Sequence, residues 1–357
     1  MIKTTLNKLF DKKDLTFWEA EEVANLLMNG QVNGSQTASL LTALRIKGET
    51  SHEIAGFANA MRNNGVKILH NSKNLIDVCG TGGDNSGSFN ISTAAAFVVA
   101  GAGVNVAKHG NRSITSISGS SDVLNELGVN IELTPEQSKK ALEEIGITFL
   151  FAPIYHPAMK NVAPIRLELG FKTIFNVLGP LTNPASTTKQ MIGTFNYDIA
   201  FKMAEAAKIL KMERVAFVCT NNQYDEITLT DSSQIVEVNG DKAITVREIN
   251  AETFNFPKIV LDDIKGGTPL ENGKIILDIF NNQSSVSQFN VVIANAALAL
   301  YTTGKYSTIS EAQQAAEDSI KSGKALEKLN TLIDFGNNND WYSISNNRSE
   351  NWGSEKA

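Results

Sequence analysis

The sequence predicts an α/β protein, with a small all-helical N-terminal domain and a larger α/β domain built on a mostly parallel central sheet. Three observations support this fold class. The first ~65 residues show only helical periodicity, apolar strand-like runs alternate with helical stretches from residue 76 onward, and a glycine-rich turn follows the first of those runs. A chain of 357 residues is also long enough for two domains and a large core.

The N-terminal segment reads as short helices joined by small loops. Residues 16–19, Thr-Phe-Trp-Glu, have the pattern of a capping box, and apolar residues then recur at helical spacing until Gly30. A second helix is expected over about residues 35–46, and a third from residue 50 or 51. We therefore assign residues 1–70 to a helical domain.

Beyond this segment, strands and helices alternate as in a parallel sheet with crossover helices. The predicted strands are 76–79, 104–106, 149–151, 215–218, 227–229 and 235–238, and the predicted helices are 92–101, 135–145, 199–210 and 291–303. The Gly- and Pro-rich segment 164–184 reads as a crossing between the domains. We assign 71–341 to the α/β domain, with a contribution to the helical domain from about 165–190, and 342–357 to a polar tail.

The strongest chemical signal is the turn 80–84, Gly-Thr-Gly-Gly-Asp, directly after the first predicted strand. Glycines there let the backbone approach a ligand, and the N–H groups of the turn and of the next helix start attract anions. Asn90, Ser92 and Thr93 add an amide and two hydroxyls. The turn is neither a Walker A loop nor a G-x-G-x-x-G motif. A plain turn with Ser92 as helix N-cap is the alternative, but this combination favours phosphate binding.

A second signal is the run 108–113, Lys-His-Gly-Asn-Arg-Ser, which leads into a Ser-rich stretch. We predict a flexible, polar and locally basic loop. Lys108 and Arg112 can supply charge-assisted hydrogen bonds to a diphosphate. The alternative is a solvated loop ending in a helix N-cap at Ser121 or Asp122, but its place directly after a buried strand favours ligand binding.

Two weaker signals follow. Asp225 and Glu226 precede a predicted strand, and adjacent carboxylates on a loop can hold Mg²⁺ together with phosphate oxygens. Adjacent acids are also common on plain surface, so the pair alone does not decide between the two. His156 and Met159 can contact a ligand, although a buried, hydrogen-bonded histidine is the commoner arrangement.

Composition and charge exclude several classes of protein. With 32 Lys+Arg against 38 Asp+Glu, the net charge is −6, which argues against general nucleic-acid binding or adhesion to an anionic membrane. A small anionic substrate in a local basic pocket remains open. The only two cysteines, Cys79 and Cys219, cannot form a disulfide framework and suit a reducing compartment. The first residues lack the apolar core of a signal peptide, and the longest apolar stretch, 94–106, is too short to span a bilayer, so we expect a cytoplasmic protein.

Taken in their order along the chain, these motifs resemble the anthranilate phosphoribosyltransferase family of tryptophan biosynthesis, which has the nucleoside phosphorylase and type III–IV phosphoribosyltransferase fold. The combination of the glycine-rich turn with Lys108-His109-Gly110-Asn111 is specific to it. The resemblance covers nearly the whole chain. Further matching segments are 41–50, 53–56, 156–159, 164–166, 173–184, 295–297 and 322–326.

The resemblance implies transfer of a phosphoribosyl group from phosphoribosyl diphosphate to the amine of anthranilate, and it implies roles for individual residues. Contacts to phosphoribosyl diphosphate are implied for Gly80, Gly83, Asp84, Ser88, Asn90, Ile91, Ser92, Thr93, Lys108, Ser116 and Ser120. Contacts to anthranilate are implied for Gly80, His109, Asn111, His156, Arg166 and Gly179. Ser92, Asp225 and Glu226 would organise Mg²⁺, with two ions expected per site. No residue is expected to act as a catalytic acid or base. A homodimer through the helical domain is also implied.

Two positions depart from the family pattern. Ile117 stands where members often carry a Lys, and the segment 219–222, Cys-Thr-Asn-Asn, replaces the usual His-Gly before the acidic pair. Two alternatives therefore stay open. One is a pyrimidine nucleoside phosphorylase, and the other is a non-catalytic nucleic-acid-binding paralogue on the same fold. The pI near 5.4 argues against the second, which would be expected to have a basic face.

Overall fold

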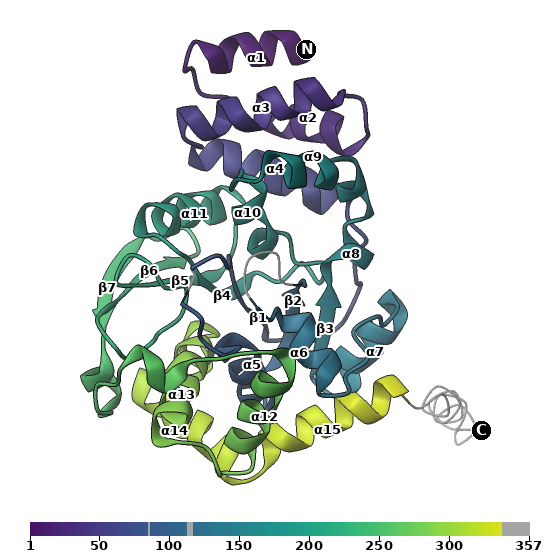
Figure 1. The fold of residues 1–357 in the computed structure, drawn as a ribbon. Helices are drawn as coiled ribbons and strands as arrows, with labels where there is room; N and C mark the ends of the chain where they lie inside the picture. Colours follow the sequence, from purple (N-terminus) through teal and green to yellow (C-terminus); the bar gives the residue numbers. More distant parts are fainter. Residues whose placement is uncertain (85, 113–116, 338–357) are drawn as a thin grey trace, which may run out of the picture.

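A seven-stranded sheet forms the centre of the larger domain (Figure 1). The computed structural model describes residues 1–84, 86–112 and 117–337. The strands are β1 (Leu75–Gly80), β2 (Asn105–Gly110), β3 (Ile147–Phe151), β4 (Lys189–Gly193), β5 (Arg214–Thr220), β6 (Ser233–Asn239) and β7 (Thr245–Ile249). Their spatial order is β3-β2-β1-β4-β5-β6-β7, in which the first five are parallel and β6 is antiparallel to both of its neighbours, β5 and β7. The predicted fold class is confirmed.

The strand order places a binding crevice at the middle of the sheet. The chain builds outward from β1 to β2 and β3 on one side, and from β4 to β5 on the other. In sheets of this kind, ligands bind outside the carboxyl ends of the strands where the order reverses. Here that point is the β1/β4 pair, whose last residues, Gly80 and Gly193, lie opposite each other. The glycine-rich turn therefore begins at the crevice.

Four helices stack at the N-terminal end of the molecule, at the top of Figure 1. They are α1 (Ile2–Phe10), α2 (Phe17–Met28), α3 (Gly34–Lys47) and α4 (Ser51–Asn64). The capping boxes of α2 and α4 are complete, with Thr16 and Glu19 at one and Thr50 and Glu53 at the other. The sequence located three of the four helices, and it missed α1.

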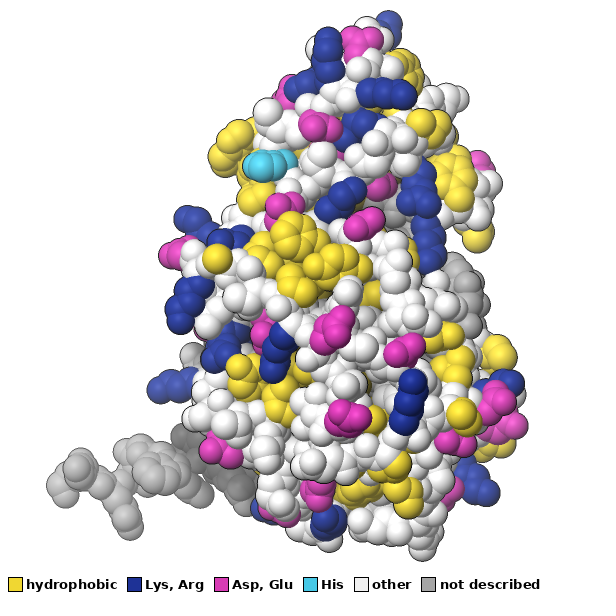
Figure 2. All heavy atoms as spheres, turned by 90° about the vertical axis from the view of Figure 1, so that its left-hand side faces the viewer, with side chains coloured by type: hydrophobic (Ala, Val, Ile, Leu, Met, Phe, Trp, Pro, Cys, Tyr) yellow, Lys and Arg dark blue, Asp and Glu magenta, His cyan; other side chains and the backbone are white. Residues whose placement is uncertain are grey.

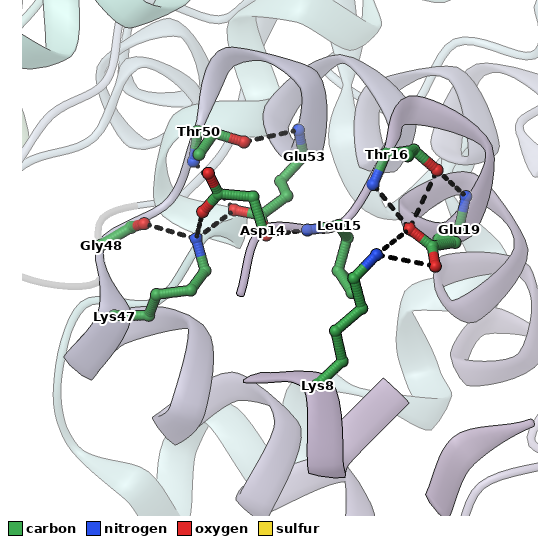
Figure 3. A network of polar contacts seen from close by, with 9 residues as sticks. All are labelled: Lys8, Asp14, Leu15, Thr16, Glu19, Lys47, Gly48, Thr50 and Glu53. Carbon is green, nitrogen blue, oxygen red and sulfur yellow. Dashed lines mark hydrogen bonds and ion pairs between the residues drawn. The ribbon is translucent and has the colours of Figure 1, made fainter. Parts of the chain in front are cut away.

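A buried polar network joins these helices (Figure 3). The fully buried Glu53 carboxylate accepts hydrogen bonds from the backbone N–H groups of Leu15 and Thr50, both at 2.9 Å. Lys47 donates to it at 3.0 Å and to the exposed carboxylate of Asp14 at 2.7 Å. The Lys47 side chain is 5% exposed, whereas the neighbouring pair of Lys8 and Glu19 is 29% and 42% exposed. The first ion pair is buried and the second is largely solvated.

Replacing Lys47 by Met is expected to lower the free energy of unfolding by about 3 kcal/mol, because it leaves the buried Glu53 charge without its cation. The matched control, Lys8→Met, removes an exposed ion pair and should cost less than about 1 kcal/mol. Urea unfolding of both variants followed by circular dichroism measures the two values. Equal losses would contradict the distinction between the buried and the solvated pair.

The remaining helices cover both faces of the sheet. They are α5 (Ile91–Gly101), α6 (Ser120–Glu126), α7 (Pro135–Glu144), α8 (Ala152–Tyr155), α9 (Ala163–Leu169), α10 (Phe175–Leu178), α11 (Tyr197–Ile209), α12 (Pro269–Phe280), α13 (Val286–Thr302), α14 (Ile309–Lys321) and α15 (Lys324–Asn337), with short 3₁₀ turns η1 (Pro157–Asn161), η2 (Gly179–Thr182), η3 (Ala251–Phe254) and η4 (Leu261–Ile264). Of the described helices, none has the length and apolarity to cross a membrane.

The two largest hydrophobic cores among the described residues hold these layers together, and a smaller third one surrounds Tyr155. One lies between one sheet face and the helices α5, α13, α14 and α15. The other runs from α2–α4 through α11 to the opposite sheet face, where Ile192 and Phe217 are fully buried. Since α9 contacts α3 and α10 contacts α4, the segment after β3 also packs on the helical domain. The helical domain is thereby fixed above the carboxyl ends of the strands.

The side of the molecule that bears β6, β7 and α11 shows how its surface is organised (Figure 2). Lys and Arg side chains are interspersed with Asp and Glu over this face, and hydrophobic side chains gather at its mid-height. The helical domain forms the narrower upper end.

Two local predictions were wrong, and so was the alternative in which Ser92 caps the helix after the glycine-rich turn. The run from Lys108 to Gly110 is not a flexible loop but the end of β2, paired with β3. Residues 227–229 form no strand, because the amide of Asn295 on α13 bonds both the N–H and the C=O of Ile227, and Leu229 has a φ of 60°. The N-cap of α5 is Asn90 rather than Ser92. Two strands, β4 and β7, were not predicted.

Candidate active site

A pocket of about 650 Å³ opens at the carboxyl ends of β1 and β2, with α9 and α10 on its far side. It brings together most of the residues that the sequence singled out. Those on its wall are Gly80, Gly83, Asn90, Ser92, Lys108, His109, Asn111, Arg112, Ser120, His156, Met159, Arg166, Gly179, Asp225 and Glu226. Residues from five separate segments thus meet at one place.

The other candidates lie elsewhere. Ile91 and Thr93 are fully buried in the first turn of α5. Asp84 and Ser88 belong to the turn but not to the pocket wall. Asp84 accepts a hydrogen bond from the Ser86 N–H at 3.1 Å. Ser116 lies outside the described residues.

The acidic pair is tied directly to the glycine-rich turn and the helix start. Asp225 accepts a hydrogen bond from the Gly82 N–H at 2.8 Å, and Glu226 accepts one from the Ser92 N–H at 3.2 Å. Glycine is required for this approach, since a Cβ at Gly80 would lie 2.6 Å from the Asp225 carboxylate. A Cβ at Gly193 would overlap the backbone carbonyl of Asp225. The ends of β1 and β4 therefore hold the acidic pair in place.

The carboxylates of this site repel one another. Burial, followed by the neighbouring charge of Asp84, raises the pKa of Asp225 to about 7. Burial and the charge of Asp225 likewise raise the pKa of Glu226 well above its usual value. Such a group of oxygen ligands fits a hard cation such as Mg²⁺, which binds through one or two carboxylates and completes its shell with water and phosphate oxygens. Within the described residues, no three acidic, His or Cys side chains form a metal site by themselves.

Lys108 brings a buried cation to the same place. Its side chain extends from β2 beneath the turn, where the ammonium donates to the Val78 carbonyl at 2.6 Å and to Ser92 Oγ at 3.5 Å. Burial lowers the pKa of Lys108, and the charge of Asp77 acts in the opposite direction. The strand fixes this charge beside the helix start at Ser92 more rigidly than a loop would.

Asp77 on β1 organises the opposite side of the pocket from within the core. Its carboxylate is fully buried and accepts hydrogen bonds from the His109 N–H at 3.1 Å, Asn183 Nδ2 at 2.8 Å and Gln190 Nε2 at 3.2 Å. Gln190 also donates to the carbonyl of Pro180 at 2.7 Å. Asp77 therefore joins β1, β2, β4 and the η2 turn. The sequence showed no local signal for it.

Two buried histidines lie side by side at the other end of the pocket. The ring centroids of His109 and His156 are 5.1 Å apart, and His109 Nδ1 lies 3.1 Å from the Gly179 carbonyl. A neutral His109 that donates from Nδ1 has a free lone pair on Nε2. Burial lowers the pKa of His109 to about 3, with His156 adding to the effect, and burial lowers that of His156 to about 4. Both rings are therefore neutral near pH 7.

These lowered pKa values predict a pH dependence of stability. An unfolded histidine titrates near pH 6.5, so below that pH the unfolded chain binds protons that the folded chain excludes. As the pH falls from 6.5 to the folded pKa of a histidine, protonation of the unfolded chain should therefore lower the free energy of unfolding. The expected loss is up to about 1.4 kcal/mol per pH unit for each histidine. Urea unfolding at pH 7 and pH 5 of the wild type and of His156→Gln checks this.

The comparison between the two proteins isolates the histidine, because the buried carboxylates with raised pKa values are present in both. We expect His156→Gln to lose less stability on acidification than the wild type does. An identical change in the two proteins would contradict the neutral, buried state of His156.

Arg166 on α9 supplies the cation at this end. Its guanidinium lies over the Phe175 ring, 5.4 Å from the centroid, and donates to Asn176 Oδ1 at 3.4 Å. Burial lowers its pKa without removing the charge. A planar guanidinium beside an aromatic ring can hold an aromatic carboxylate by paired hydrogen bonds. Asn111, from the other wall, is the second polar group placed there.

Sequence reasoning missed Lys172. Its ammonium donates to the Gly83 carbonyl at 2.8 Å and lies 3.6 Å from the centroid of the Phe195 ring. Burial lowers its pKa, while Asp225 and Asp84 act in the opposite direction. It links the segment after α9 to the glycine-rich turn across the pocket mouth. A lone Lys in a Gly- and Pro-rich segment carries no local pattern that would reveal this.

The structure also explains the departure at 219–222. Asn221 and Asn222 both have a φ of 51°, in the left-handed region that Gly and Asn tolerate best. Asn222 Oδ1 accepts a hydrogen bond from the Tyr197 N–H, and Thr220 Oγ1 donates to the Glu226 carbonyl. The turn that presents the acidic pair is therefore kept without a glycine. The other departure, Ile117, is 76% exposed.

Comparison with known proteins gives a consistent result. Residues 3–65 match the helical bundle domain, and residues 72–326 the a/b domain, of a glycosyl transferase family. The chain is 45% identical to the anthranilate phosphoribosyltransferase of Acetivibrio thermocellus over 94% of this chain and 97% of that protein. It is 43% identical to that of Priestia megaterium over 93% and 97%.

Solved structures agree with these relatives. The crystal structure of anthranilate phosphoribosyltransferase from Thermus thermophilus matches with a TM-score of 0.87 at 38% identity, covering 93% of this chain and 98% of that one. The Saccharomyces cerevisiae enzyme in complex with PRPP (phosphoribosyl diphosphate) and Mg matches with a TM-score of 0.86 at 25% identity, covering 94% and 97%.

Proposed function

This chain belongs to the anthranilate phosphoribosyltransferase family of glycosyl transferases, and from that premise we propose that it makes N-(5-phosphoribosyl)anthranilate and diphosphate from anthranilate and PRPP. One observation carries the proposal. A single pocket has anion-binding and metal-binding groups at one end and a guanidinium beside an aromatic ring at the other. The first set of groups suits a diphosphate, and the guanidinium beside a ring suits an aromatic carboxylate.

We propose that PRPP occupies the end formed by the glycine-rich turn. Backbone N–H groups, the hydroxyls of Ser92 and Ser120, the Asn90 amide and the Lys108 ammonium supply donors there. Asp225 and Glu226, with Ser92, would hold Mg²⁺, and two ions per site are proposed on the family resemblance. When bound, Mg²⁺ supplies positive charge that neutralises the diphosphate.

Anthranilate is proposed to lie between Arg166 and Asn111, with His109, His156 and Gly179 lining its place. The bond between the anomeric carbon and the diphosphate oxygen breaks as the bond to the amine nitrogen forms, diphosphate leaves with the bonding electron pair, and the nitrogen releases one proton to water. An aromatic amine is already neutral near pH 7, so the nitrogen lone pair is available and no strong base is needed. The residues act by aligning the amine and by placing donors where charge grows on the leaving group.

The direct test is the loss of anthranilate fluorescence on mixing the purified protein with anthranilate, PRPP and Mg²⁺. We expect consumption that requires both PRPP and Mg²⁺. Phosphorolysis of uridine or thymidine without consumption of anthranilate would instead identify a nucleoside phosphorylase. Absence of both reactions, together with binding to nucleic acid, would identify the non-catalytic alternative.

We further propose that the protein works as a cytoplasmic homodimer joined through the helical domain. Both cysteines are free and buried, which suits a reducing compartment. Phe10, Trp18 and Ile46 are 61%, 72% and 74% exposed on α1–α3. Light scattering after size-exclusion chromatography should give twice the chain mass of 38.6 kDa. A monomer at micromolar concentration would contradict the dimer.

A further inference from the structure

A segment distant in sequence supports the second half of the glycine-rich turn. Residues 264–272, here called the backing segment, run from the end of η4 into α12. The Gly266 N–H donates to the Gly87 carbonyl at 2.7 Å, and the Phe89 N–H donates to the Ile264 carbonyl at 3.1 Å. A Cβ at Gly266 would lie 2.7 Å from the backbone nitrogen of Phe89. The two segments are therefore packed backbone to backbone.

A chain of side-chain amides continues this contact into the pocket. The Gly267 N–H donates to Asn272 Oδ1 at 2.7 Å, and Asn272 Nδ2 donates to Asn90 Oδ1 at 2.8 Å. Asn90 Nδ2 then donates to the Ser118 carbonyl at 3.2 Å. Asn272 is 2% exposed, whereas Asn90 lies on the pocket wall.

The two ends of this chain fix the direction of both amides. A backbone N–H can only donate and a backbone carbonyl can only accept, so Gly267 and Ser118 leave one orientation for each amide between them. Asn90 must therefore turn its NH₂ group toward Ser118 and the pocket. Ser118 takes one of its two N–H groups, and the second can reach a ligand.

The position of Asn90 supports the same conclusion. It is the N-cap residue of α5, where an Asn side chain normally accepts a hydrogen bond from the helix. Here it makes no capping bond. Its oxygen is taken up by Asn272 instead, and its nitrogen faces the pocket. A donor in that direction suits a phosphate or ribose oxygen and not a cation.

We propose that Asn272 is a positioning residue for the substrate, which sets the amide of Asn90 so that it donates to the phosphoribosyl diphosphate. Asn272 does not line the pocket, so it acts only through Asn90. This inference rests on the proposed binding of PRPP at the glycine-rich turn. It assigns a part in substrate binding to the start of α12, about 180 residues away from the turn in sequence.

A double-mutant cycle tests the proposal. The variant Asn272→Asp keeps the shape and the acceptor for the Gly267 N–H, but it can no longer donate to Asn90, whose amide is then free to reverse. The variant Asn272→Leu removes the donor without adding a charge. Each is made in the native background and in an Asn90→Ala background, and the Kd for PRPP with Mg²⁺ is measured by calorimetry. Asn281→Asp, on the exposed C-terminal end of the same helix, is the control.

We expect both Asn272 variants to weaken PRPP binding by about tenfold or more in the native background, as for loss of a hydrogen bond to a charged group. In the Asn90→Ala background the effect should shrink to about twofold or less, because the residues no longer interact. The KM for anthranilate should stay unchanged, and Asn281→Asp should bind PRPP as the wild type does. A purely structural role would lower the melting temperature but leave the Kd of the folded protein unaltered.

Two results would overturn the inference. One is unchanged PRPP binding in both Asn272 variants, and the other is an equal loss in the two backgrounds. If the wild type binds PRPP but consumes no anthranilate, the proposed transferase function fails, while the cycle still decides the role of Asn272. A wild type that binds no PRPP would overturn both.

Discussion

Replacing Asp225 by Asn and Glu226 by Gln together is expected to lower kcat/KM by about 10³-fold, since several kcal/mol of charge stabilisation depend on the cation that these carboxylates would hold. Both side chains stay the same size and keep an oxygen for the N–H groups of Gly82 and Ser92. The fold should therefore survive. The variant removes two ionisable carboxylates, and with them the negative charge that they would present to a cation.

The physical reason lies in the balance of charge at this end of the pocket. Asp84, Asp225 and Glu226 surround a site where Lys108 is a buried cation, and the pKa values of Asp225 and Glu226 are raised by burial and then by the neighbouring carboxylates. PRPP brings further negative charge. Without a divalent cation the carboxylates would repel the substrate, so they contribute to activity only when Mg²⁺ is bound.

Three measurements check this expectation. Initial rates across a Mg²⁺ titration should show that the wild type needs the ion and that the double variant no longer responds to it. Circular dichroism should show an unchanged fold. Asp231→Asn, an exposed carboxylate on the same loop region, is the control and should keep full activity. A double variant with wild-type activity and the same Mg²⁺ requirement would remove Asp225 and Glu226 from the metal site.

Much of the fold was predictable because its signals are local. The capping boxes at Thr16 and Thr50 set helix starts within a few residues, and the glycine-rich turn directly after β1 marked the end of a parallel strand. Such patterns depend on hydrogen bonds between residues close in sequence. The position of the site followed from them, because carboxyl ends of parallel strands share one edge of the sheet.

What could not be predicted depends on partners far away in sequence. The sequence alone predicts a loop at Lys108. In the structure its ammonium donates to the Val78 carbonyl and interacts with the Asp77 charge. The run at Ile227 reads as a strand, yet the Asn295 amide takes both of its backbone groups. Each case is a polar partner supplied by another element. No periodicity within the segment itself reports such a partner.

The same distinction separates the two kinds of site residue. Residues that line the pocket and belong to the motifs or to the segments that resemble the family, such as Asn90 and Arg166, could be named from the sequence. The residues that hold them, such as Asp77 and Asn272, are buried polar groups with no local pattern. A buried, fully bonded polar group is costly to misplace, so these residues fix the geometry that the motifs use.

Replacing Arg166 by Ala is expected to raise the KM for anthranilate by about 10²-fold or more, as for loss of paired hydrogen bonds between a guanidinium and a carboxylate. The KM for PRPP should change little, because Arg166 stands at the opposite end of the pocket from the glycine-rich turn. Arg166→Lys keeps the charge but not the planar pair of donors, so its KM for anthranilate should lie between those of the wild type and of Arg166→Ala. Initial rates with each substrate varied in turn separate these effects.

The neighbourhood of Arg166 provides the control and the contrary outcome. Glu168 is exposed on the same helix, and Glu168→Ala should leave both KM values unchanged. The Arg166 side chain lies against Phe175, so some loss of packing accompanies its removal, and the melting temperature of each variant measures that loss separately. A weaker but folded Arg166→Ala enzyme with an unaltered KM for anthranilate would move the carboxylate-binding site elsewhere in the pocket. Asn111, a polar group on the opposite wall of the same cavity, would then be the next group to replace.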